Sequence, residues 1–161
     1  LQKTAIKSWA GLYKQGKKEG RKGRTKAAPR HTTKEFATMC DTIEISPTAR
    51  RIAEQNDQFR KHVLTGGPAG TPQGRIVMTQ SIAEMGPTFQ LEAAKAVIAD
   101  STFTEDNDPY GDHTFGAVTV QGLRVWWKID LFDLDYHWGS ETPDDPAQTR
   151  RILTIMFPAD Y

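Results

Sequence analysis

One short run of strand-forming residues, VTVQGLRV at residues 118–125, constrains the fold more than any other part of the sequence. Valine, leucine and threonine favour strands. Gln121-Gly122 between them predicts a two-residue turn, because glycine adopts positive φ without strain. The two halves therefore form a β-hairpin whose turn sets the register, with Val120 opposite Leu123 and later pairs stepping outwards from there.

This register divides the hairpin into an apolar and a more polar face. On the polar face Phe115 lies opposite Lys128, and the same register extended further places His113 opposite Asp130. Cross-strand neighbours lie about 5 Å apart, so we expect an imidazole–carboxylate contact between His113 and Asp130. The apolar face is predicted to form the core, through Val118, Val120, Leu123, Val125, Trp127 and Ile129.

Two helices are predicted before the hairpin. Ser46-Pro47 is a typical helix start, because serine caps free N–H groups and proline is tolerated at the first helical position. Apolar residues at helical spacing carry this helix to about residue 64, and its charged residues, Asp57 and Arg60 among them, are expected on the other faces. Residues 88–99 carry a stripe of small and apolar residues that predicts a second helix lying on a sheet.

Two further strands complete the predicted domain. Residues 74–80 are rich in β-branched residues, and residues 151–157 are apolar on both faces, which favours a central position in the sheet. We therefore expect an α+β fold, in which two helices pack on one face of an antiparallel sheet of about four strands.

Charge is divided unevenly along the chain. Residues 1–34 carry eleven lysines and arginines against one glutamate, whereas residues 100–161 carry twelve acidic residues against four basic ones. Residues 1–45 are therefore predicted to be a flexible, disordered basic tail, or an upstream extension that is not native, and residues 46–161 a single domain. If the tail is native, we expect its segment from Lys14 to Arg30 to bind the phosphates of nucleic acid without sequence preference.

The sequence also indicates a location. It has no run of about 18 apolar residues that could cross a membrane. The first residues are polar and lysine-rich and lack the apolar centre of a secretory signal. We expect no membrane association and, by default, a cytoplasmic protein.

Candidate site residues cluster in the last third of the chain. His113 and Asp130 form a possible general-base pair, with Lys128 stabilising an anion. Trp126, Arg124 and Trp138 are candidates for a binding surface. The competing interpretation is structural, with polar groups that only satisfy one another at a sheet edge and in turns. A second set of residues could bind a metal ion, because carboxylates suit a hard divalent ion and histidine suits a transition metal. These candidate metal ligands are Asp108, Asp112, Asp133, Asp135 and His137.

Six short motifs follow one another along the chain: NDQFR at 56–60, DNDPYGDHTFG at 106–116, WKID at 127–130, GSE at 139–141, DDP at 144–146 and LTIM at 153–156. Together they resemble one bacterial family, which is known only as a domain of unknown function, DUF3768. The resemblance covers about residues 50–161 and leaves the basic tail outside. It implies a small protein, often encoded in mobile genetic regions, with no established activity. Where the family usually has an aromatic pair before a second aspartate, this chain has Leu131-Phe132-Asp133.

Two classes of function remain open, and the sequence favours the first. The first is an accessory or binding protein of bacterial mobile elements, which acts on nucleic-acid machinery through an acidic surface that resembles a phosphate backbone. A protein partner is favoured for it. The alternative is a hydrolase of the nuclease or phosphatase type, dependent on a metal or on the face that carries His113 and Asp130.

Overall fold

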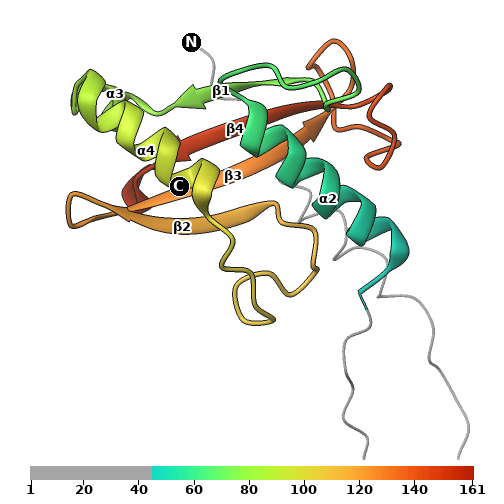
Figure 1. Ribbon diagram of the computed structural model, residues 1–161, viewed down its shortest axis with the longest axis horizontal. Helices are drawn as coiled ribbons and strands as arrows, with labels where there is room; N and C mark the ends of the chain where they lie inside the picture. The colour runs from blue at the N-terminus through green and yellow to red at the C-terminus, as the bar shows by residue number, and fades with distance from the viewer. Residues whose placement is uncertain (1–44) are drawn as a thin grey trace, which may run out of the picture. The chain divides into compact units, whose positions relative to one another are not determined.

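The computed structural model describes residues 45–161, which form a four-stranded sheet with helices on one face (Figure 1). The predictions for the tail, including nucleic-acid binding from Lys14 to Arg30, lie outside the described residues. The elements in chain order are α2 (Pro47–His62), β1 (Gly74–Met78), α3 (Gln80–Glu84), α4 (Pro87–Ala99), β2 (Phe115–Val120), β3 (Leu123–Phe132), β4 (Arg150–Met156) and the 3-10 turn η2 (Pro158–Asp160).

The α+β class is confirmed, but the sheet is mixed and not antiparallel throughout. Its strand order is β1-β4-β3-β2, with β4 inside the sheet as the apolar pattern predicts. β3 is antiparallel to both neighbours, whereas β1 runs parallel to β4, with Gly74 beside Arg151. Only the hairpin turn fixes a pairing in the sequence; a parallel pair needs a long crossover connection, which leaves no local turn signal.

The hairpin register is confirmed along the whole of β2. Val120 pairs with Leu123, and the ladder continues to Phe115 opposite Lys128. Gln121 and Gly122 have φ of 49° and 81°, as a turn of the mirror-image type requires. Leu123 differs from expectation: it lies beside the turn and is exposed.

Both predicted helices are confirmed. The Oγ of Ser46 accepts a hydrogen bond from the N–H of Ala49 at 3.0 Å and caps α2. α2 and α4 lie over the same face of the sheet (Figure 1). The helix α3 was not predicted, and it begins where the first strand was expected to continue to residue 80. The hydroxyls of Thr79 and Ser81 donate to the carboxylate of Asp160 at 2.7 and 2.8 Å, which ties the start of α3 to the turn after β4.

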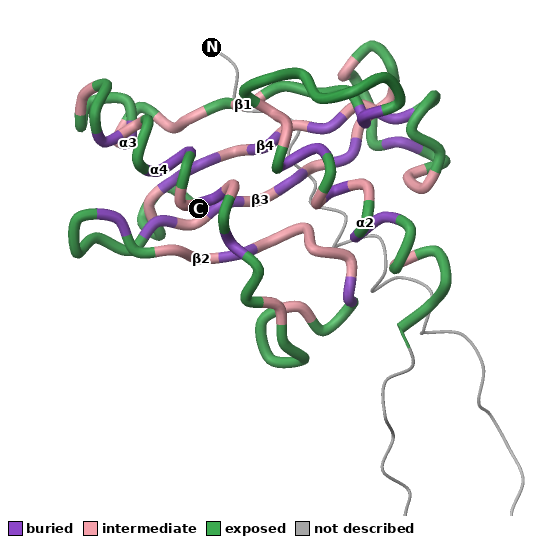
Figure 2. Tube along the Cα trace, in the orientation of Figure 1, coloured by how far each residue is buried: buried purple, intermediate pink, exposed green. Residues whose placement is uncertain are grey.

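Buried residues follow the middle of β3 and β4 and the inner sides of α2 and α4 (Figure 2). Trp127 is fully buried at the centre, as predicted. The core also includes Ile52, Phe59, Ile82, Phe89, Ala93, Val97, Val120, Val125, Ile129, Leu131, Leu153 and Ile155. Within residues 45–161, no helix is both long and apolar enough to cross a membrane.

Candidate functional site

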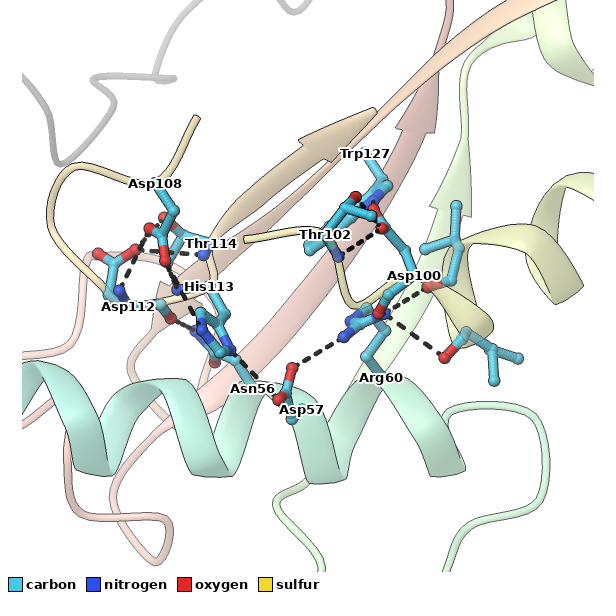
Figure 3. A network of polar contacts seen from close by, with 12 residues as sticks. Asn56, Asp57, Arg60, Asp100, Thr102, Asp108, Asp112, His113, Thr114 and Trp127 are labelled. Atoms are coloured by element: carbon cyan, nitrogen blue, oxygen red, sulfur yellow. Dashed lines mark hydrogen bonds and ion pairs between the residues drawn. The ribbon is translucent and has the colours of Figure 1, made fainter. Parts of the chain in front are cut away.

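A network of polar contacts joins α2, the end of α4 and the loop of residues 100–114 (Figure 3). Its hub is Arg60, whose side chain is only 1% exposed. One guanidinium nitrogen donates to the backbone carbonyls of Val97 and Asp100, both at 2.5 Å, and the other donates to Oδ1 of Asp57 at 2.8 Å. Because the last carbonyls of a helix lack partners within it, Arg60 acts as the C-terminal cap of a neighbouring helix.

The buried position of Arg60 corrects the prediction that it lies on a polar face of α2. The helical stripe that includes Ile52, Phe59 and Val63 passes through positions 56 and 60, so Asn56 and Arg60 face inward with it. A search of that stripe for polar residues would have found both. Hydropathy alone misses them because it ranks a charged side chain as solvent-facing.

Asp100 fixes the start of the loop. Its Oδ2 accepts the indole N–H of Trp127 at 2.9 Å, and its Oδ1 accepts the backbone N–H and the hydroxyl of Thr102 at 3.1 and 2.6 Å. Burial raises the pKa of Asp100, but the hydrogen bonds from Thr102 and Trp127 and the charge of Arg60 lower it by more, so the pKa lies below 3.8.

His113 lies between two carboxylates. Its Nδ1 is 3.2 Å from Oδ2 of Asp57, and its Nε2 is 3.7 Å from Oδ2 of Asp108. The ring stacks on Phe103 with centroids 3.7 Å apart and planes 8° from parallel. The Nδ1 atom is buried and makes no hydrogen bond that satisfies the angular criteria, although Asp57 lies close to it.

The prediction that His113 contacts Asp130 is wrong. β2 begins only at Phe115, and His113 adopts a left-handed φ of 52°, which takes its side chain out of the strand register. Asp130 instead contacts the Nζ of Lys128 at 2.6 Å. The catalytic roles of His113, Asp130 and Lys128 stay predictions.

The acidic residues just before His113 close the loop. Asp108 accepts the backbone N–H groups of Asp112 and His113, both at 3.3 Å, and Asp112 accepts the N–H and hydroxyl of Thr114 at 3.2 and 2.6 Å. Burial, and next the charge of Asp112, raise the pKa of Asp108. These carboxylates therefore act as turn caps that deliver the chain into β2.

The second acidic group also caps a turn. Asp133, Asp135 and His137, three of the predicted metal ligands, follow the end of β3 at Phe132. Asp133 accepts the N–H groups of His137 and Trp138 at 2.9 and 3.1 Å, which folds the chain back on itself. Across residues 45–161 no group of three or more histidine, cysteine, aspartate or glutamate side chains is placed to hold a metal, and the predicted metal site stays a prediction.

The three binding-surface candidates lie in two places. Trp126 and Arg124 belong to the first half of β3, on the sheet face away from the helices, since their neighbour Val125 is in the core. Trp138 lies beyond the other end of β3 and is 75% exposed. The structure therefore places them on two separate surfaces.

Sequence reasoning missed Arg151, which is fully buried under α2. Its Nε donates to Oδ1 of Asn56 at 2.9 Å and one Nη to Oε1 of Gln55 at 2.6 Å, while the other Nη has no partner among the described residues. Burial lowers its pKa to about 10. An arginine inside the start of an apolar strand, directly after Arg150, was the available signal.

Comparison with known proteins identifies the family. The family model described as "Protein of unknown function (DUF3768)" matches residues 78–160, just over half of the chain. The match is shorter than the expected span of residues 50–161 and omits the α2 motif that contains Asp57 and Arg60. No curated protein and no solved structure matches the chain. The chain belongs to the DUF3768 family of proteins of unknown function.

Proposed function

We propose that this domain is a binding protein that holds a basic segment of a partner protein at its acidic end. The observation that carries the proposal is Trp138, an indole that is 75% exposed on a turn built from hydrogen bonds. Large aromatic side chains, tryptophan above all, contribute strongly to binding surfaces.

The turn that carries Trp138 is well fixed. Besides the two N–H groups that the Asp133 carboxylate accepts, the backbone N–H of Asp133 donates to the carbonyl of Trp138 at 2.8 Å, and Phe132 forms a bridge with Gly139. Tyr136 packs over the guanidinium of Arg75 at 3.8 Å. A side chain presented on such a turn loses little conformational entropy on binding.

The surroundings of Trp138 are acidic. Asp135, Glu141 and Asp145 are exposed on the two loops of residues 133–149, which project from the same end of the sheet (Figure 1). An indole beside carboxylates suits an arginine or lysine, because the ring face attracts the cation and the carboxylates pair with it.

The partner class follows from the same chemistry. A basic segment of this kind is typical of proteins that bind nucleic acid, and the resemblance noted above makes the machinery of bacterial mobile elements the expected source. A cytoplasmic location remains part of the proposal. The hydrolase alternative has no comparable support, since both ring nitrogens of His113 face carboxylates of the protein itself.

The test is a titration of the 15N-labelled full chain with an octa-arginine peptide, followed by NMR. The indole N–H signal of Trp138, identified by its loss in Trp138→Phe, is expected to shift, and Trp138→Ala to weaken binding by about threefold to tenfold. Leu91→Ala, which truncates another exposed side chain on α4, serves as the matched control and should change nothing. Equal binding by Trp138→Ala and the parent protein, or equal shifts with octa-glutamate, would overturn the proposal.

A further inference from the structure

The sheet face opposite the helices collects basic and aromatic side chains. Trp127, Ile129 and Leu131 point into the core, so the alternate residues of β3 point the other way. Cross-strand pairing assigns residues of the other strands to the same face. Its basic and aromatic members are Arg75 on β1, Phe115 on β2, Arg124, Trp126, Lys128 and Phe132 on β3, and Arg150 on β4.

The charge on this face is opposite to that of the loops. Asp130 is the one acidic residue in the four strands, and it is already paired with Lys128 at 2.6 Å. Arg75, Arg124 and Arg150 form no ion pair with any residue from 45 to 161. The positive charges of these three guanidinium groups therefore remain unpaired, although one face of the Arg75 guanidinium packs against Tyr136 and the C-terminal third of the chain is acidic as a whole.

An aromatic cluster lies on the same face. The ring of Trp126 packs edge-on against Phe115 with centroids 5.4 Å apart and against Tyr161 with centroids 5.9 Å apart. Tyr161 is 72% exposed, so its ring is open to a further stacking partner. Aromatic rings on an open sheet, flanked by cations, are the arrangement on which unpaired nucleobases stack while their phosphates are neutralised.

We propose that this sheet face binds single-stranded nucleic acid, with the arginines on its phosphates and the rings of Trp126 and Tyr161 against its bases. A free phosphate or a duplex would use the arginines only, because its bases are absent or already stacked. This surface meets the acidic end that carries Trp138 at Arg75, whose guanidinium packs against Tyr136, but binding here does not depend on the protein-binding function proposed above.

The first test locates the contact in the full chain. An oligothymidylate carrying 5-iodouracil is irradiated with the protein, and the adducts are mapped by mass spectrometry. Adducts on Trp126, Phe115 or Tyr161 are expected. Adducts confined to residues 1–44, or to side chains on the helix-covered side of the sheet, would overturn the proposal.

The second test measures the charge contribution by fluorescence anisotropy as a function of salt. Each phosphate contact on a single strand contributes about −0.7 to the slope of log affinity against log salt, so the triple variant Arg75→Gln, Arg124→Gln, Arg150→Gln should flatten that slope by about 2. The matched control removes three exposed charges from the helices, by Arg50→Gln, Lys61→Gln and Lys95→Gln. Equal flattening in both variants would overturn the assignment to this face.

The third test separates bases from phosphates. Tyr161→Ala alters an exposed ring and leaves the core intact, and it should lower affinity for the single strand by about fivefold or more. Affinity for a duplex of the same length should not change. A duplex bound as tightly as the single strand, with no effect of Tyr161→Ala on either, would mean phosphate contact alone and refute the single-strand proposal.

Discussion

The indole N–H of Trp127 donates to Oδ2 of Asp100 at 2.9 Å, inside the protein. This bond joins the centre of β3 to the residue that ends α4 and opens the loop of residues 100–114. The same carboxylate accepts two hydrogen bonds from Thr102. One buried side chain thus links the sheet, a helix end and the loop that carries His113.

Replacement of this carboxylate by Asp100→Asn should destabilise the protein in a pH-dependent way. The pKa of Asp100 lies below its ordinary value of 3.8, so the carboxylate stabilises the fold above pH 3.8, and that contribution disappears as the pH falls through the lower, folded-state value. At pH 7 the variant should lose about 1–3 kcal/mol in the free energy of unfolding. The asparagine side chain presents to the indole N–H either an N–H₂ group, which cannot accept the hydrogen bond, or a neutral carbonyl, which accepts it less strongly than a carboxylate. Urea unfolding at pH 7, 5, 3 and 2 should show this difference narrowing below pH 3.8. A difference that stays constant with pH would contradict the assignment.

Arg60→Ala should be among the most destabilising substitutions in the domain. It removes the donor to the Asp100 carbonyl and to one oxygen of Asp57, and it leaves the Val97 carbonyl with the backbone N–H of Asp100 as its remaining donor. A buried acceptor that loses its donor costs about 1–3 kcal/mol. Arg50→Ala, on an exposed position of the same helix, should change the free energy of unfolding by no more than about 0.5 kcal/mol. Similar urea midpoints for the two variants would show that Arg60 is not the cap described here.

Gly116→Ala should disturb the buried indole. A Cβ at this position would lie 2.5 Å from ring atoms of Trp127, so the ring or the strand must move. Overpacking of this kind costs about 1–3 kcal/mol. Thermal unfolding should show the loss, and near-ultraviolet circular dichroism should show a changed tryptophan environment. Thr119→Ala, exposed on the same strand, is the control, and an unchanged spectrum for Gly116→Ala would refute the close contact.

Asp133→Ala should loosen the turn that presents Trp138. The amide groups of His137 and Trp138 lose their acceptor, and a net loss of about 1 kcal/mol for such a bond corresponds to about fivefold faster hydrogen exchange. Asp135→Ala removes the same charge from the same turn without removing a hydrogen bond found among the described residues. If the two variants exchange at the same rate, charge and not the cap holds the turn.

Local chemistry made the hairpin and the helix ends predictable. Gln121-Gly122 specifies a turn that only a narrow set of backbone angles can make, and Ser46-Pro47 marks a helix start, so those features follow from neighbouring residues. The parallel pairing of β1 with β4 joins distant segments and has no local signal. The prediction of an antiparallel sheet failed there for that reason.

The site was less predictable than the fold. The register correctly placed Phe115 opposite Lys128, but its extension to His113 assumed that the strand continued, and a single left-handed residue ended it. The partners of His113 come from α2 and the preceding loop, which strand register cannot specify. Tertiary packing, and not spacing along the chain, brings His113, Asp57 and Arg60 together.

The interior position of β4 has a consequence for synthesis. β4 is the last strand of this sheet to leave the ribosome, and it alone pairs with both β1 and β3. Before it emerges, β1 has no strand to pair with, and β3 has only β2. Until β4 emerges, the nascent domain therefore holds an incomplete sheet with unpaired strand edges, and exposed edges and apolar surface of this kind make folding intermediates prone to aggregation.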